Sequence, residues 1–231
     1  MSCPSESALK AHLTSPFFQG LSPADFHTVV SAADSRQMLA KSIVVNQGAS
    51  ADCLFLLTKG RARHFFITQD GIRRIGLRWV LPGDIFGAVA LSSTQDLYLV
   101  STEMVRDGWV LVWDRKTISN LAGRYPKLWE NAVAIAADYL AFYAATRIAL
   151  TCSGAEERLA YVLTTLASSI GHHVPTGIAL DLTNEELAEI ANVAVFTVSR
   201  LLSEWQRKGA VIKSRGKILL RSPEQLLQSI A

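Results

Sequence analysis

The residues whose types and spacing point most directly to chemistry lie near the carboxyl end of the 231-residue chain. Residues 194–221 carry seven basic side chains and a single acid, Glu204. The preceding residues 151–193 have the opposite balance, with six acids and one arginine. Binding to phosphates requires positive charge sorted onto one stretch, and random surface composition rarely supplies that contrast. The charge pattern therefore favours a nucleic-acid-binding segment.

Two short helices are predicted where the acidic stretch meets the basic one. Thr183 and Glu186 have the spacing of a capping box, in which each side chain accepts a hydrogen bond from the other residue's backbone amide. Asn192 stands where the chain must turn sharply, and asparagine tolerates the left-handed conformation. A second helix over residues 196–208 has a buried stripe of Val198, Leu201, Leu202 and Trp205. Two short helices joined by such a turn form a helix-turn-helix.

The start of the second helix leaves several side chains off its buried stripe, and this is the end that enters a major groove. These side chains are Val195, Phe196, Thr197, Ser199 and Arg200. After Gly209, a signal for the end of a helix, two short apolar runs predict a hairpin wing. Its basic residues are Lys213, Arg215 and Lys217. The sequence therefore predicts a winged helix-turn-helix that binds double-stranded DNA.

Residues 39–121 have a different sequence pattern, in which short runs of strand-forming residues alternate with glycines. Many short strands with frequent turns predict an antiparallel barrel or jelly roll. Asp70-Gly71 is a candidate hairpin turn. The strand-like runs are Cys53–Phe66, Arg73–Gly87, Tyr98–Val105 and Trp109–Trp113.

A helical segment begins near Tyr125, and its apolar residues repeat with alternating spacings of four and three. This heptad pattern is typical of two helices that pair. We expect a homodimer joined along this seam; the alternative is that the helix packs on its own barrel. Residues 155–169 predict another helix, and residues 171–177 a loop. The seam residues are Leu128, Ala132, Ile135, Tyr139, Phe142, Thr146 and Ala149.

Composition excludes several other classes of protein. The net charge of +3 is only mildly basic, so local charge carries the argument for DNA. Cys3, Cys53 and Cys152 are an odd number, lie far apart and include no C-x-x-C pair, which argues against a disulfide framework and against a structural zinc site. Without a signal peptide or a long apolar run, we expect a soluble, cytoplasmic protein with no membrane partner. A metal-dependent barrel enzyme would need several histidines, but residues 34–121 contain only His64, so we expect no enzyme and no metal.

The chain resembles the CRP/FNR family of bacterial transcription regulators in two places. The first is its carboxyl-terminal run, LTNEELAEIANVAVFTVSRLLSEWQRKGAVIKSRGKILL. The second is the series of strand-ending glycines in the barrel, at Gln47-Gly48, Leu57–Gly60 and Leu81–Gly87. The resemblance implies an α+β fold whose sensory domain, residues 1–121, is a cyclic-nucleotide-binding-type β-roll (a jelly roll). It also implies a dimerisation helix over residues 122–150 and a winged helix-turn-helix over residues 151–231, with a palindromic operator and RNA polymerase as partners.

The recognition helix keeps part of the family's pattern. The resemblance implies a guanine contact for Arg200 and a phosphate contact for Thr197. Val195 and Phe196 stand where the family often has Arg and Glu, which hydrogen-bond to base edges. An apolar pair cannot do so, although it can contact a thymine methyl group; the alternative is that Phe196 packs onto the first helix. Ala194 replaces the usual serine cap, which removes about 1 kcal/mol of helix stabilisation.

The effector region departs from the family's cyclic-AMP binders. Those relatives carry a glutamate for the ribose shortly after the F-G of the barrel, and an Arg-Ser pair for the cyclic phosphate. Here Ala88 holds the first position, and Leu97, Tyr98 and Leu99 occupy the segment where the pair would lie. Without a cation, a cyclic nucleotide loses its main charge-assisted contact. We therefore expect no response to cyclic AMP in the usual way.

Four alternatives for regulation stay open, and one of them is haem sensing through His64 or Cys152, although a lone histidine in a strand is typical of an ordinary barrel residue. Arg73, Arg74 or Arg78 would restore cyclic-nucleotide binding as a substitute cation from a neighbouring strand. A small apolar or aromatic effector would fit between barrel and helix, although the aromatic residues concerned are also typical of an ordinary core. A barrel without any effector is the fourth. We expect no cofactor, and the effector is unknown. The candidate effector pocket consists of Arg78, Trp79, Phe86, Gly87, Ala88, Tyr98, Tyr139 and Phe142.

Overall fold

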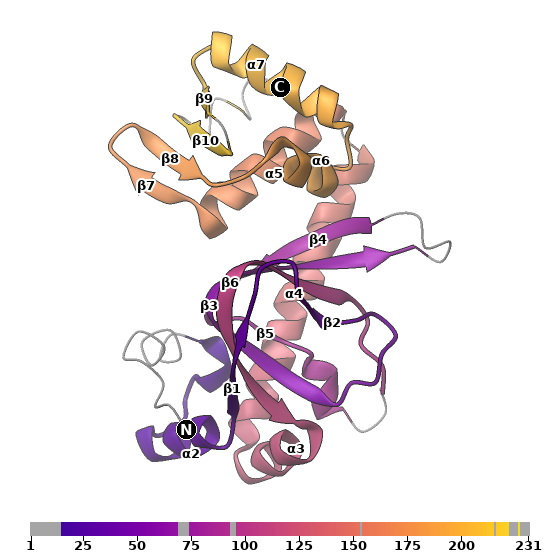
Figure 1. The fold of residues 1–231 in the computed structure, drawn as a ribbon, viewed down its shortest axis with the longest axis vertical. Coiled ribbons are helices and arrows are strands. Elements are labelled where there is room, and N and C mark those ends of the chain that lie inside the picture. Colours follow the sequence, from indigo (N-terminus) through magenta and orange to yellow (C-terminus); the bar gives the residue numbers. More distant parts are fainter. Residues whose placement is uncertain are drawn as a thin grey trace. The chain divides into compact units, whose positions relative to one another are not determined.

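A computed structural model describes residues 15–68, 74–92, 96–152, 154–214, 216–221 and 226 of the chain. The chain divides into two compact units, Met1–Ala141 and Phe142–Ala231 (Figure 1). The turn expected at Asp70-Gly71 and the residues Arg73 and Arg215 lie outside the described residues. Among the described residues, no helix combines the length and the apolar character that a membrane span requires.

The first unit is the antiparallel β-roll that the sequence predicts. Its main sheet has the strand order β1-β6-β3-β4, with β2 paired to β6 and β5 paired to β3. A 3-10 helix, η1 (Pro16–Phe18), and α2 (Pro23–Ser31) precede the sheet, and neither was predicted from the sequence. The strands are β1 (Asp34–Met38), β2 (Ile43–Val45), β3 (Cys53–Ile67), β4 (Arg74–Val80), β5 (Ile85–Phe86) and β6 (Ser101–Asp114).

Strand β6 joins two of the predicted strand-like runs into one. Gly108 lies between those runs, and a Cβ atom there would collide with the carbonyl oxygen of Lys59 on β3. Glycine therefore allows the two backbones to approach closely. The glycine marks a close crossing of β3 and β6 and not the end of a strand.

The roll contains two clusters of buried side chains. One fills its interior, and it includes Phe55, Phe86, Tyr98 and Met104. The other lies where η1, α2, the short helix α3 (Arg115–Arg124) and the start of α4 (Pro126–Cys152) cover the sheet. There the indole nitrogen of Trp113 donates to the carbonyl oxygen of Val29 at 2.8 Å, which ties α2 to β6.

The long helix α4 packs on its own roll, so the predicted dimer seam is wrong over its first half. Leu128 and Ala132 are buried in the cluster with Trp113, and Ile135 packs against that cluster. The Tyr139 hydroxyl donates to the carbonyl oxygen of Ile85 at 3.2 Å. The heptad pattern identified an apolar stripe, but from Leu128 to Tyr139 the partner of that stripe is the roll of the same chain.

Another side of α4 is also apolar, and it is exposed. Trp129, Val133 and Leu140 are 46%, 52% and 70% exposed, at spacings of four and seven residues. These three residues are called the outer stripe below. The expected domain boundary between residues 121 and 122 falls inside α3, because the new helix begins only at Pro126, where the fixed φ of proline suits a first turn.

The second unit is a winged helix-turn-helix. The helices are α5 (Ala155–Ile170), α6 (Asn184–Ala191) and α7 (Val195–Arg207). A four-stranded antiparallel sheet has the order β7-β8-β10-β9. Its strands are β7 (His172–Val174), β8 (Gly177–Leu180), β9 (Val211–Ser214) and β10 (Lys217–Leu220). The loop expected over residues 171–177 is therefore wrong, since most of it is strand β7 and the turn into β8.

Candidate DNA-binding surface and effector region

The turn between α6 and α7 has the chemistry that the sequence predicts. The Thr183 hydroxyl accepts from the Glu186 amide at 3.2 Å, and the Glu186 carboxylate accepts from the Thr183 amide at 2.8 Å. Asn192 ends α6 in the left-handed conformation, with φ of 50° and ψ of 53°. These two features fix where the first helix starts and where the chain turns into the second.

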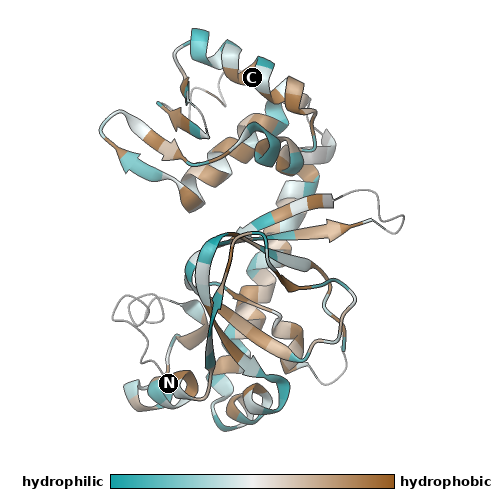
Figure 2. Ribbon diagram, in the orientation of Figure 1, coloured by the Kyte–Doolittle hydropathy of each residue, from teal (hydrophilic) through white to brown (hydrophobic). Residues whose placement is uncertain are grey.

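One side of α7 anchors it to the rest of the unit. Its buried residues are the four predicted ones, Val198, Leu201, Leu202 and Trp205. The indole nitrogen of Trp205 donates to the Glu156 carboxylate on α5 at 3.2 Å. Hydrophobic and hydrophilic residues alternate along α7 (Figure 2). The anchoring determines which side chains are left to face outwards.

The first turn of α7 presents apolar side chains to solvent. Phe196 is 78% exposed and Val195 41% exposed, so the alternative in which Phe196 packs onto the first helix is wrong. Arg200 follows one helical turn after Phe196 and is also exposed. Thr197 and Ser199 are half-buried beside them. Phe196 and Arg200 are called the recognition face below.

Charged side chains surround the recognition face. Glu204 pairs with Arg200 at 3.7 Å and with Lys208 at 3.5 Å. From the wing, the Lys213 ammonium donates to the Ser199 hydroxyl at 3.3 Å, and the Lys213 amide donates to the Gln206 side chain at 3.1 Å. These contacts bring β9 against α7, so Lys213 lies next to the recognition helix.

Lys217 is exposed at the start of β10, and the turn before it contains Gly216 in the left-handed region at φ of 68°. The hairpin is regular, with Lys217 opposite Ser214 and Ile218 opposite Lys213. The structure thus brings Lys213 close to α7 and presents Lys217 on the wing. Arg215, the third predicted wing residue, lies outside the described residues.

In the effector region, Tyr98 is part of the core of the roll. Its hydroxyl accepts from the Cys53 amide at 2.9 Å and donates to the Cys53 carbonyl oxygen at 2.8 Å. Phe55 and Phe86 stack at 5.0 Å between ring centroids. Gly87 has a φ of 74°, and a Cβ atom there would lie 2.8 Å from the Cys53 carbonyl oxygen and 3.1 Å from the Tyr98 ring. These side chains pack against one another inside the roll.

The residues next to Tyr98 point away from the core. Leu97 and Leu99 are exposed, as expected for alternation along an extended chain. Ala88 opens the short 3-10 helix η2 (Ala88–Leu91) directly after Gly87. None of these three side chains carries charge, so they provide no cation for a phosphate.

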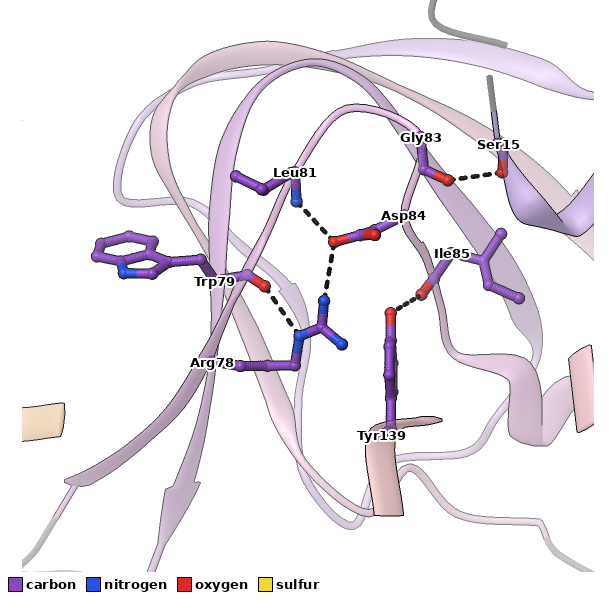
Figure 3. A network of polar contacts seen from close by, with 8 residues as sticks. All are labelled: Ser15, Arg78, Trp79, Leu81, Gly83, Asp84, Ile85 and Tyr139. Atoms are coloured by element: carbon purple, nitrogen blue, oxygen red, sulfur yellow. Dashed lines mark hydrogen bonds and ion pairs between the residues drawn. The ribbon is translucent and has the colours of Figure 1, made fainter. Parts of the chain in front are cut away.

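Arg78 links three parts of the first unit (Figure 3). Its guanidinium donates to the Asp84 carboxylate at 3.1 Å and to the Trp79 carbonyl oxygen at 3.0 Å. It also lies over the Tyr139 ring of α4, 3.9 Å from the ring centroid. Asp84 accepts a further hydrogen bond from the Leu81 amide at 2.9 Å. Burial raises the pKa of Asp84, against the opposing effects of the Leu81 amide and of Arg78.

The candidate effector residues therefore have several different surroundings. Phe86 and Tyr98 lie in the core, whereas Arg78 and Tyr139 meet at the contact between β4 and α4. Gly87 is half-buried directly after Phe86. Trp79 is stacked under the Arg61 guanidinium, 4.5 Å from its ring centroid. Phe142 belongs to the second unit, where its ring meets that of Tyr143 at 5.6 Å.

Arg78→Ala should lower the free energy of unfolding of the roll by about 2–3 kcal/mol, because it leaves the mostly buried Asp84 carboxylate without its cation. Adding Asp84→Asn should recover part of that loss. The pKa of Asp84 is raised in the folded state, so protonation favours folding. Arg78 lowers that pKa, so its removal raises the pKa of Asp84 further. The deficit of Arg78→Ala should therefore be largest at pH 7 and shrink as the pH falls.

Urea unfolding of the full chain at pH 7 and pH 5 measures both effects. Arg36→Ala is the matched control, because Arg36 pairs with Asp34 at 3.4 Å on the exposed surface and should contribute little. If Arg78→Ala and Arg36→Ala lowered the free energy of unfolding equally, Arg78 would not be the cation that stabilises the buried Asp84 carboxylate.

His64 is a core histidine. It is buried, and its Nδ1 lies 2.9 Å from the Thr102 hydroxyl. Burial lowers the pKa of His64 to about 3, and the nearby charge of Arg78 acts in the same direction. The imidazole is therefore neutral at physiological pH. Within the described part of the chain, no three His, Cys, Asp or Glu side chains gather as metal ligands would.

Comparison with known proteins matches both units. Residues 35–125 match the cyclic nucleotide-binding domain, and residues 157–229 match the Crp-like helix-turn-helix domain. The anaerobic regulatory protein of Bacillus subtilis is 26% identical over 204 residues, which cover 87% of this chain and 85% of that protein. The cyclic AMP receptor protein of Thermus thermophilus is 28% identical over 217 residues, covering 94% and 97%. FixK2 from Bradyrhizobium japonicum has the same fold, with a TM-score of 0.75 at 22% identity over 86% of this chain and 98% of that one.

Proposed function

Because this chain belongs to the CRP/FNR family and is a DNA-binding transcription regulator, we propose that it binds a palindromic operator as a homodimer. In this proposal it acts in the cytoplasm by binding, without catalysis, and contacts RNA polymerase at the promoter. One observation carries the assignment to DNA. The recognition face lies on a helix that Trp205 anchors from behind, with Lys213 of the wing held beside it at Ser199.

The assignment of contacts follows from the side chains. Arg200 has the length and the planar fork to donate two hydrogen bonds to a guanine in the major groove. Lys213, Lys217 and Arg215 would neutralise phosphates without reading sequence. Thr197 and Ser199, half-buried beside the recognition face, have hydroxyls that can donate to a backbone phosphate. Glu204, the acid that pairs with Arg200, must release it when DNA binds.

The outer stripe of α4 supports a dimer. One side of this helix already packs on its own roll through Leu128 and Ala132. Trp129, Val133 and Leu140 expose a second apolar side, which is costly in water unless another surface covers it. A second copy of the same helix is self-complementary to it under two-fold symmetry. Two recognition helices would then lie about 34 Å apart, one turn of DNA.

Selection of bound fragments from a random pool of duplex DNA tests this function. The full chain should enrich one sequence with two inverted half-sites, about one helical turn apart from centre to centre. Binding should weaken steeply as salt concentration rises, because phosphate contacts release counterions. Failure to enrich any sequence, or enrichment of a single unrepeated half-site, would contradict the proposal.

We propose further that the roll does not respond to cyclic AMP in the usual way. A relative is named as a cyclic AMP receptor protein, but here Ala88 and the Leu97–Leu99 segment replace the polar groups, and Tyr98 packs into the core. The alternative is that Arg78 supplies the missing cation. Its guanidinium is engaged with Asp84 and Tyr139, and both contacts would have to give way.

We expect calorimetry to show no binding of cyclic AMP or cyclic GMP tighter than about 1 mM, equivalent to about −4 kcal/mol. Moving an anionic phosphate from water to a site beside apolar side chains costs roughly several kcal/mol when no guanidinium group pairs with it. A micromolar dissociation constant would contradict the prediction. If Arg78→Ala then abolished that binding, the substitute-cation alternative would be correct.

A further inference from the structure

Phe196 is the most exposed large hydrophobic side chain in the described part of the chain, at 78%. It belongs to the first turn of α7, and Val195, 41% exposed, precedes it. An aromatic ring of this size usually contributes to a core or to an interface, because its transfer out of water is strongly favourable. Its exposure therefore calls for a partner outside the chain.

Phe196 cannot turn into the core of its own unit while α7 keeps its place. Val198 and Trp205 hold the opposite side of the helix, and both are fully buried. The Trp205 indole is further tied to Glu156 at 3.2 Å. Rotating the helix to bury Phe196 would expose those side chains and break that hydrogen bond. The partner of Phe196 is thus the surface that α7 faces.

The charge around Phe196 identifies that partner as duplex DNA. Arg200 follows one helical turn later on the same side, and Lys213 lies against Ser199. A major groove presents mainly hydrogen-bond donors and acceptors to such a surface. The apolar group that it offers is the 5-methyl group of thymine.

We propose that Phe196, supported by Val195, packs against a thymine methyl group in each half-site and thereby makes thymine a determinant of operator choice. The proposal rests on the DNA-binding function above. It deepens that function by naming the base feature that an apolar recognition helix can distinguish.

The spacing on the helix also places that thymine. Phe196 and Arg200 are four residues apart, which is about 6 Å along a helix with a rise of about 1.5 Å per residue. Base pairs are stacked about 3.4 Å apart. The methyl-sensitive thymine should therefore lie within about two base pairs of the guanine that Arg200 contacts.

The test uses the selected operator with each thymine replaced, one position at a time, by uracil, which lacks only the methyl group. Each half-site should contain one position at which uracil weakens binding of the full-length protein. The loss should be about fourfold when one half-site is changed and about fifteen-fold when both are changed. Replacing that uracil by cytosine and then by 5-methylcytosine separates the effect of the methyl group from that of base pairing. The operator with 5-methylcytosine should therefore bind more tightly than the operator with cytosine.

The Phe196→Ala protein should bind the thymine operator and the uracil operator with equal affinity. That affinity should be lower than the affinity of the unchanged protein for the thymine operator. The substitution is on an exposed side chain, and circular dichroism checks that α7 stays folded. Lys217→Ala is the matched control: it should weaken both operators and preserve their ratio. Arg200→Ala should also preserve the ratio while losing discrimination at the guanine.

Two results would overturn the inference. One is an unchanged affinity when uracil replaces thymine at every position. The other is a thymine preference that persists in Phe196→Ala. Both leave sequence-specific binding intact, so they differ from a failure of the proposed function, in which no operator would be enriched at all.

Discussion

Replacing Arg200 with alanine is expected to weaken binding to the selected operator by about 1–3 kcal/mol for each half-site. The guanidinium is the one exposed cation on the recognition face, and its two parallel donors match the acceptors of a guanine. Preference at one base pair of each half-site should relax together with the affinity. Titration of the operator and of variants at each position measures both effects.

The control for Arg200→Ala is Lys217→Ala on the wing. Lys217 is exposed at the start of β10 on the hairpin. Its replacement should therefore weaken binding to all sequences alike and lower the slope of the salt dependence by about one unit for each subunit. Equal losses for Arg200→Ala on the operator and on random DNA would show that Arg200 contacts only the phosphate backbone.

Leu140→Lys is expected to convert the dimer into monomers and to weaken operator binding by about 10²- to 10⁴-fold. Leu140 is 70% exposed in a single chain and would be covered in the dimer, where a lysine would bury its charge. Two linked recognition helices bind two half-sites together, and a monomer loses that advantage. Sedimentation velocity at micromolar concentration and operator titration measure the two quantities.

Ala134→Lys is the matched control for this variant. Ala134 is exposed on the side of α4 that also carries Glu130 and Asp138, away from the outer stripe. It should leave the dimer intact. A wild-type protein that sediments as a monomer and still binds a palindrome tightly would contradict the dimer, and so would a Leu140→Lys protein that stays dimeric.

The corrected packing of α4 changes which substitutions test the dimer. Ile135 lies on the predicted seam, but it packs against the core of the roll. A charge at Ile135 would destabilise the first unit whether or not a dimer forms. The outer stripe avoids this ambiguity, because its side chains are exposed in the isolated chain.

The helix-turn-helix and the side chains that it leaves exposed can be predicted from the sequence alone. The capping box at Thr183, the left-handed Asn192 and the stop at Gly209 are local devices, made within a few residues of one another. The spacing of Val198, Leu201 and Trp205 then leaves Phe196 and Arg200 on the outside. Features of this kind depend on backbone chemistry and helical period, both of which can be read from neighbouring residues.

The partners of the apolar stripes emerge only from long-range packing. Both sides of α4 are apolar in sequence, and no local signal shows that Leu128 packs on the roll while Leu140 is exposed. In the sequence, Tyr98 and Arg78 are likewise compatible with an effector pocket. In the structure, Tyr98 hydrogen-bonds to the backbone of Cys53, and Arg78 pairs with Asp84. These contacts join residues 6 to 45 positions apart, across strands whose register is set by the whole sheet. Hydrophobic burial is not directional, so the sequence shows that a surface must be covered, and long-range packing selects what covers it.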